Sequence, residues 1–212
     1  MLSFEGYKKL AQSDDLADYE KIGFQSAHRG ETEANIFEDF VSKIPNLSRP
    51  SINIIDIGCG CSKPVRSMIQ HTKENNQNLT LIDSAEMLAN LPDEDHLLKA
   101  SQQFPHDEEF LRSHLSKFDI VIIYSVVHAI TSFQDPFTFL DRAVDLLAPG
   151  GEMLVGDIAN ISKKKRFLSS PGGAAFHEKW SGKSCPTIDW NCKHSGFDDS
   201  SILQILLRYR LM

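Results

Sequence analysis

Short apolar runs alternate with amphipathic segments along the middle of the chain. The segment at 62–74 opens with Ser62 and Pro64, as a helix start does, and the apolar spacing at 135–147 is also helical and stops before Pro149. Such an alternation predicts an α/β fold, a doubly wound, Rossmann-like, mostly parallel sheet with helices on both faces. Five short apolar runs typical of strands are the expected strands, at 52–57, 79–82, 97–100, 118–124 and 153–158, and the run at 97–100 has the weakest pattern.

The two ends of the chain have a different, helical character. Apolar spacing predicts N-terminal helices at 16–22 and 32–44, and the stretch from Asp198 favours a helix, although its apolar residues also alternate as in a strand. The chain stops in apolar sequence at Leu211-Met212, which suggests that the natural protein continues. We expect one domain, residues 1–212, divided into an N-terminal helical cap (1–50), a ligand-binding core (51–160) and C-terminal helices on the acceptor side (161–212).

Composition narrows the class of protein. The chain has 212 residues, of which 41% are hydrophobic, and this excludes a disordered or fibrous protein. A net charge of −7 gives no general attraction to nucleic acid or to an anionic membrane. No apolar stretch is long enough to span a bilayer and the first residues lack a signal-peptide pattern, so we expect a soluble, cytoplasmic protein.

The four cysteines are expected to be reduced packing thiols. Cys59 and Cys61 form a C-x-C pair, and Cys185, Cys192 and His194 are the further residues that a zinc site would need. No pair has the C-x-x-C spacing of common structural zinc sites, so no metal is predicted.

The first expected strand leads into a glycine-rich turn that carries an acid. The turn reads Asp56-Ile-Gly58-Cys59-Gly60, and the absence of a Cβ at both glycines lets a ligand approach the backbone. Ligands of open α/β sheets bind at the carboxyl ends of strands, where this turn lies. A dinucleotide fingerprint would need glycine in place of Lys63. The acid before the first glycine suits a ligand with an amine, such as the amino-acid end of S-adenosylmethionine.

A second acid, Asp83, follows the next expected strand and precedes Ser84 and Met87. An acid at this position can accept hydrogen bonds from both hydroxyls of a ribose. Together with the motifs Phe-Asp-Ile-Val at 118–121 and Leu-Ala-Pro-Gly-Gly at 147–151, the two turns resemble the ordered motifs of class I S-adenosylmethionine-dependent methyltransferases. The resemblance covers about residues 52–158, and the set of motifs carries it.

The resemblance implies a seven-stranded sheet whose last strand is antiparallel, with the cofactor across the ends of the first, second and fourth strands. Two closing strands are not evident after residue 160, so either residues 185–212 hold a reduced version or the sheet is truncated. Ser101 stands near the position where the family often has an acid bonded to the adenine amine. The expected cofactor contacts are Asp56, Gly58, Cys59, Gly60, Asp83, Ser84, Met87, Ser101, Ser125 and Arg29.

Two histidines are candidates for a catalytic base, and Asp157 is a further alternative. His128 follows the fourth strand, where a neutral imidazole could take the proton of a hydroxyl acceptor, or could instead make a structural hydrogen bond or pack beside the adenine. His177 lies in a polar and aromatic segment that either lines the acceptor pocket or forms a helix face. Arg29 either pairs with the methionine carboxylate or lies on the surface. The basic run Lys163–Arg166 is either a solvated helix start or a phosphate contact.

The leading functional hypothesis is an enzyme that transfers a methyl group from S-adenosylmethionine to a small-molecule acceptor. The basic run allows a phosphorylated or nucleotide-linked sugar or a surface-glycan precursor, and the acidic balance argues against DNA. One alternative is a non-catalytic S-adenosylmethionine-binding regulatory or partner subunit, which would keep the acids and glycines without an acceptor pocket. The other is a protein or RNA methyltransferase. The sequence leaves the acceptor and the oligomeric state open.

Overall fold

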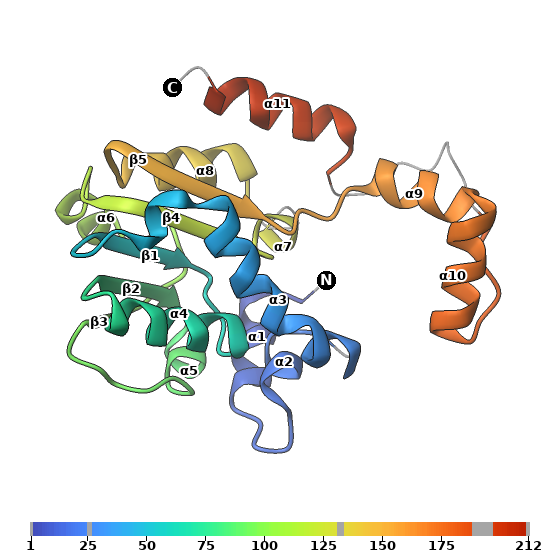
Figure 1. The fold of residues 1–212 in the computed structure, drawn as a ribbon, viewed down its shortest axis with the longest axis horizontal. Coiled ribbons are helices and arrows are strands. Elements are labelled where there is room, and N and C mark those ends of the chain that lie inside the picture. Colours follow the sequence, from blue (N-terminus) through green and yellow to red (C-terminus); the bar gives the residue numbers. More distant parts are fainter. Residues whose placement is uncertain (1, 25–26, 131–133, 188–196, 211–212) are drawn as a thin grey trace. The chain divides into compact units, whose positions relative to one another are not determined.

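A computed structural model describes residues 2–24, 27–130, 134–187 and 197–210. The chain divides into two compact units, Met1–Asp157 and Ile158–Met212 (Figure 1). The first unit contains the sheet and both acidic turns, and the second consists of helices in its described part. The expected division of one domain into three parts stays a prediction.

The first unit is built on a five-stranded, entirely parallel sheet with the strand order β3-β2-β1-β4-β5 (Figure 1). Its inner strands β1, β2 and β4 are apolar and mostly buried, because helices cover both sides of a parallel sheet. The order reverses at β1, and ligands bind at such a switch point. The predicted fold class is confirmed. The strands are β1 (Asn53–Ile57), β2 (Asn78–Asp83), β3 (Leu97–Ser101), β4 (Phe118–Tyr124) and β5 (Leu147–Gly156).

The last strand begins earlier than the sequence pattern indicates. Phe118 of β4 pairs with Leu147, but Ile120 pairs with Glu152, so β5 accommodates extra residues in a bulge. Gly150 lies in this bulge with a φ of +79°, a conformation that glycine adopts without strain. The strand expected at 153–158 therefore begins earlier than predicted, because residues 149–151 are part of β5.

Helices pack on the sheet through the apolar positions that the sequence places at helical spacing. Phe40, Val65 and Met68 join the strand residues Ile54 and Ile122 in one core cluster. Asp135 caps its helix as its position predicts, since its Oδ2 accepts the Thr138 N–H at 2.7 Å. The helices of this unit are α1 (Phe4–Ala11), α2 (Asp18–Lys21), α3 (Ala27–Lys43), the 3₁₀ helix η1 (Pro45–Ser48), α4 (Lys63–Glu74), α5 (Ala85–Leu88), α6 (Glu108–Ser113), α7 (Val127–Ile130) and α8 (Pro136–Asp145).

The second unit contains α9 (Ile161–Ser169), α10 (Pro171–Ser181) and α11 (Asp199–Arg210). Asn160 caps α9 by accepting the Lys163 N–H at 2.8 Å, and its side-chain amide donates to Asp199 at 2.9 Å. Asp199 also pairs with Arg166, which joins α9 to α11. The helical interpretation of the C-terminal stretch is confirmed.

The seven-stranded sheet that the family resemblance implies is not found in the described residues. These contain five strands, all of them parallel, and the described part of 185–212 contributes only α11 and an isolated bridge between Asn160 and Phe197. The same described residues contain no helix with the length and apolar character needed to cross a membrane.

Candidate functional site

A cavity of about 230 Å³ lies where the carboxyl ends of β1, β2 and β4 meet in the first unit. Most of the residues that the sequence singles out converge on it, although they are far apart along the chain. The predicted site residues that line the cavity are Arg29, Asp56, Gly58, Cys59, Gly60, Asp83, Met87, Ser125 and His128. Ser84 directly follows β2 and Ser101 is the last residue of β3, and neither of them lines the cavity.

The glycine turn after β1 is fixed by its contacts within the protein. Gly58 and Gly60 have φ values of +75° and +64°. A Cβ on Gly58 would lie 2.5 Å from Cγ2 of Val126, and one on Gly60 would lie 2.8 Å from Cγ2 of Ile22. The prediction assigned the free space beside these glycines to a ligand. The structure shows that two side chains of the protein occupy that space.

Two backbone N–H groups donate hydrogen bonds to the carboxylate of Asp83 at the end of β2. Gly60 N donates to its Oδ2 at 3.0 Å, and Ser84 N donates to its Oδ1 at 2.7 Å. Burial raises the pKa of Asp83 to about 6, and the two N–H donors oppose that shift. Ser84 itself serves the fold, because its Oγ accepts the Met87 N–H at 3.2 Å and caps α5.

Asp56 is the more unusual of the two acids. Only 5% of the residue is exposed, and no donor among the described residues bonds to its carboxylate. Burial, and secondarily the charge of Asp83, raise the pKa of Asp56 to about 7. A buried carboxylate without a donor is costly, so a ligand that brings a hydrogen-bonded cation to it would gain more than the same contact would give in water.

The sequence reasoning missed two glutamines that follow β3. Gln102 and Gln103 line the cavity, whereas Ser101 pairs with Asp83 within the sheet. Gln102 N donates to the Asp83 carbonyl at 3.0 Å, and the side-chain oxygen of Gln102 is buried without a hydrogen-bond partner in the described part of the chain. Their position after β3 could have identified them, because β3 ends at Ser101 and the first residues beyond a strand end are the ones that face the crevice.

The exits of β4 and β5 bring further polar groups together. Ser125 follows β4, Asp157 follows β5, and the Ser125 hydroxyl donates to Oδ2 of Asp157. Arg29 of α3 reaches the same oxygen at 3.8 Å. His128 on α7 is half-buried and lines the cavity near this corner.

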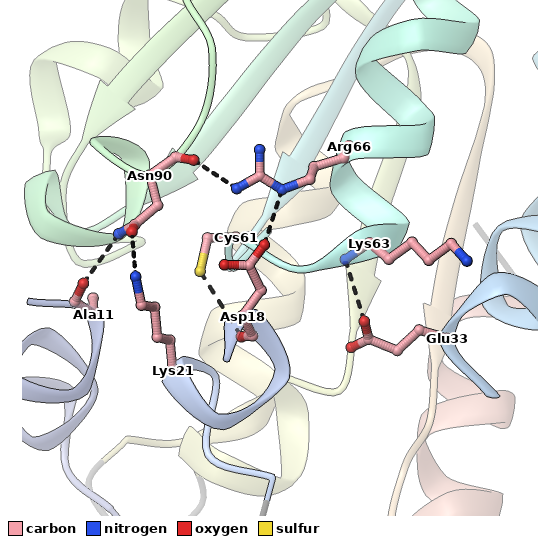
Figure 2. A network of polar contacts seen from close by, with 8 residues as sticks. All are labelled: Ala11, Asp18, Lys21, Glu33, Cys61, Lys63, Arg66 and Asn90. Atoms are coloured by element: carbon pink, nitrogen blue, oxygen red, sulfur yellow. Dashed lines mark hydrogen bonds and ion pairs between the residues drawn. The ribbon is translucent and has the colours of Figure 1, made fainter. Parts of the chain in front are cut away.

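The N-terminal segment forms one wall of the cavity, through Phe4, Tyr7, Ile22 and Phe24. Figure 2 shows the polar network that holds this segment to the core, and Asn90 is its centre. Asn90 accepts a hydrogen bond from the buried Lys21 at 2.7 Å and donates to the Ala11 carbonyl at 3.1 Å. Arg66 donates to the Asn90 carbonyl at 2.7 Å and to Asp18 at 3.1 Å.

The remaining predicted residues belong to the second unit. His177 is half-buried on α10, and its assignment as a base stays a prediction. Lys163 and Lys164 are exposed at the start of α9, as a solvated helix start would be. Cys59, Cys61 and Cys185 are free thiols, and no metal-binding cluster exists among the residues that the structure describes. Cys192 and His194 lie outside those residues.

The comparisons with known proteins agree with this geometry. Residues 55–153 match the family model described as a methyltransferase domain. This stretch of the chain is therefore similar to methyltransferase domains. The match includes both acidic turns and extends from within β1 into β5, so it agrees with the resemblance found in the sequence. A comparison with curated proteins gives no match.

Solved structures resemble the methyltransferase domain in fold. The plantazolicin methyltransferase BpumL, in complex with S-adenosylhomocysteine (SAH), is 20% identical, with 97% of this chain and 75% of that chain covered and a TM-score of 0.53. The CurJ carbon methyltransferase is 15% identical, with 97% and 50% covered and a TM-score of 0.52. A precorrin-6y C5,15-methyltransferase from Geobacter metallireducens GS-15 is 14% identical, with 56% and 60% covered and a TM-score of 0.41. The chain thus spans less than two thirds of the length of the last two.

Proposed function

We propose that the domain binds S-adenosylmethionine in the cavity and transfers its methyl group to a small-molecule acceptor. The observation that carries this proposal is the convergence of two acids from neighbouring strand ends. Asp56 and Asp83 reach one cavity on either side of the turn that contains Gly58 and Gly60. The two carboxylates match the two polar parts of the cofactor, the amino-acid end and the ribose.

Asp83 is the proposed ribose-binding residue. An ionised carboxylate has about four acceptor positions, and the backbone donors of Gly60 and Ser84 use two of them. Two positions therefore remain for the two ribose hydroxyls. The backbone donors also hold the carboxylate in place before a ligand arrives, so little of its binding energy is lost to ordering.

Asp56 and Gln102 are the proposed partners of the two ends of the cofactor. Asp56 has no donor among the described residues, and the ammonium group of the cofactor would supply one. The buried side-chain oxygen of Gln102 would accept a hydrogen bond from the adenine amine, a role that the sequence reasoning had assigned to Ser101. Met87 is 2% exposed on the cavity wall and offers an apolar surface to the adenine ring.

The protein has little covalent chemistry to perform in this reaction. S-adenosylmethionine supplies a methyl group on a positively charged sulfur, which is a good leaving group. The residues of the chain then have to hold the nucleophile in line, remove its proton and exclude water. The aromatic wall formed by Phe4, Tyr7 and Phe24 supports the exclusion of water, and His128, which lines the same cavity, is the proposed acceptor of the proton.

The nature of the acceptor is the less constrained part of the proposal. A phosphorylated or nucleotide-linked acceptor requires cations, and Lys163–Arg166 is the basic run in the sequence. Arg166 is engaged by Asp199, so Lys163 and Lys164 are the side chains of this run that we propose for a phosphate. Lys163→Ala/Lys164→Ala should raise the KM for phosphorylated acceptors while the affinity for SAH stays constant.

The proposal is tested in two steps. Calorimetry with S-adenosylmethionine and SAH measures binding, and a screen of candidate acceptors measures the production of SAH. Binding with turnover of a small molecule supports the proposal. Binding without turnover of any small molecule would favour a regulatory subunit or a macromolecular acceptor, and absence of binding would refute the proposal altogether.

A further inference from the structure

The exits of β4 and β5 place a serine and an aspartate against each other. Tyr124 pairs with Gly156 at the ends of the two strands, and Ser125 N donates to the Gly156 carbonyl at 3.1 Å. The next residues are Ser125 and Asp157, which have φ values of +60° and +52°. Neither is glycine, so each position is strained, and such positions persist only where the surrounding structure imposes them.

The side chains of this pair are connected to a third group. The Ser125 hydroxyl donates to Oδ2 of Asp157, so its oxygen remains available as an acceptor. Nη1 of Arg29 lies 3.8 Å from the same Oδ2, and the guanidinium stacks 4.1 Å from the centre of the Phe24 ring. Ser125, Arg29 and Phe24 all line the cavity.

Arg29 extends the connection to the other side of the glycine turn. Its Nε lies 3.6 Å from Oε1 of Glu33, whose side chain is only 4% exposed. Oε2 of Glu33 accepts the backbone N–H of Lys63 at 3.3 Å, at the first residue of α4 (Figure 2). One chain of polar contacts therefore runs from the end of β5 through α3 to the start of the helix that follows Gly58 and Gly60.

The charges along this series of polar contacts define the electrostatic surroundings of Arg29. The guanidinium faces two carboxylates, those of Glu33 and Asp157, so its charge is already compensated within the protein. The side chain of Asp157 is 42% exposed, so its replacement by a smaller, uncharged residue leaves no deeply buried cavity. The contribution of Asp157 should therefore appear in the placement of its partners more than in the stability of the fold.

We propose that Asp157 is a positioning residue, which fixes the Ser125 hydroxyl and the Arg29 guanidinium in the wall of the cofactor cavity. Without it, the Ser125 hydroxyl rotates freely and Arg29 keeps Glu33 as its only counter-charge among the contacts described above. The affinity for the cofactor then falls, because two groups of the wall have to be ordered when it binds. This inference rests on the proposed function, since it assumes that the cavity holds S-adenosylmethionine.

The test is a double-mutant cycle on Asp157 and Ser125, with SAH as the calorimetric probe. Asp157→Ala should weaken binding about 10-fold, the scale of one lost charge-assisted hydrogen bond. Asp157→Asn keeps an acceptor for the Ser125 hydroxyl and should restore most of the loss. In the double variant Asp157→Ala/Ser125→Ala, the fold-loss of affinity for SAH should be smaller than the product of the two single fold-losses. The difference should be about 3-fold or more, because the two residues act together.

A structural aspartate provides the matched control. Asp107 is exposed and caps α6, so Asp107→Ala should lower the Tm and leave the affinity for SAH unchanged. If Asp157→Ala shows the same pattern, or if its loss multiplies with that of Ser125→Ala, Asp157 has no positioning role. Failure of the unaltered protein to bind SAH is a separate result and would overturn the proposed function instead.

Discussion

Replacement of Gly58 by alanine tests whether Val126 fixes the glycine turn. The positive φ of +75° alone should cost the new residue about 1–2 kcal/mol. The added Cβ would also lie 2.5 Å from Cγ2 of Val126, and overpacking of this kind costs about 1–3 kcal/mol more. Gly58→Ala should therefore lower the free energy of unfolding by about 2–5 kcal/mol.

Gly150 is a matched control for the backbone contribution. Its φ of +79° is nearly the same, but nothing lies within 4 Å of a Cβ added there. Gly150→Ala should lose only the backbone contribution of about 1–2 kcal/mol. In the double variant Gly58→Ala/Val126→Ala the steric part should disappear, giving a favourable coupling of about 1–3 kcal/mol.

Urea unfolding followed by far-UV circular dichroism is the appropriate assay. Far-UV circular dichroism reports on the secondary structure of the unit that contains the sheet, whereas Trp180 belongs to the second unit. If Gly58→Ala costs no more than Gly150→Ala, Val126 can move aside, and the explanation given for this glycine is wrong. The same variant should also bind SAH more weakly, because the displaced Val126 lines the cavity.

Three further predictions concern the acids, the N-terminal wall and the base. Because burial and Asp83 raise the pKa of Asp56 to about 7, the folded protein without ligand binds more protons than the unfolded chain between about pH 4 and pH 7. Stability should fall as the pH rises through that range, and Asp56→Asn should make the fall smaller without abolishing it, because the pKa of Asp83 is also raised, to about 6. Urea unfolding compared at the two ends of the range measures the fall, and an unchanged fall contradicts the assignment. Asn90→Ala deprives the buried Lys21 ammonium of its acceptor and should lower the free energy of unfolding by about 2–4 kcal/mol. Hydrogen exchange should become faster only in residues 4–24, and a uniform increase along the chain would show that Asn90 does not hold this segment to the core. His128→Gln should lower kcat by about 10²-fold at constant affinity for SAH, and unaltered turnover would exclude it as the base.

The sequence was most informative where local chemistry decides the structure. Short apolar runs predicted all five strands, and β1, β2 and β4 are the ones that are buried along most of their length, as strands covered on both faces must be. Asp56 and Asp83 were found because an acid directly after such a run has to lie at the carboxyl edge of the sheet. Ser101 was preferred to Gln102 because the third strand was expected to end one residue too early, and a shift of one residue exchanges the face that a side chain occupies.

The sequence pattern did not predict contacts between distant segments. The packing of Val126 against Gly58 depends on the register of β1 and β4, which no local motif encodes. The hydrogen bond between Lys21 and Asn90 joins residues 69 positions apart. The pairing of Arg29 with Glu33 was readable as an i,i+4 pair, but its approach to Asp157 was not, since that depends on how α3 crosses the end of β5.

Calorimetric titration of the protein and of Asp83→Ala with SAH tests the central claim most directly. The unaltered protein should bind SAH, and the variant should bind it at least about 10-fold more weakly, since two charge-assisted hydrogen bonds to the ribose are lost. Asp93→Ala, at a side chain that is 95% exposed, should bind as the unaltered protein does. Equal affinity in the protein and in Asp83→Ala, or no binding by either, would contradict the assignment of this cavity to S-adenosylmethionine.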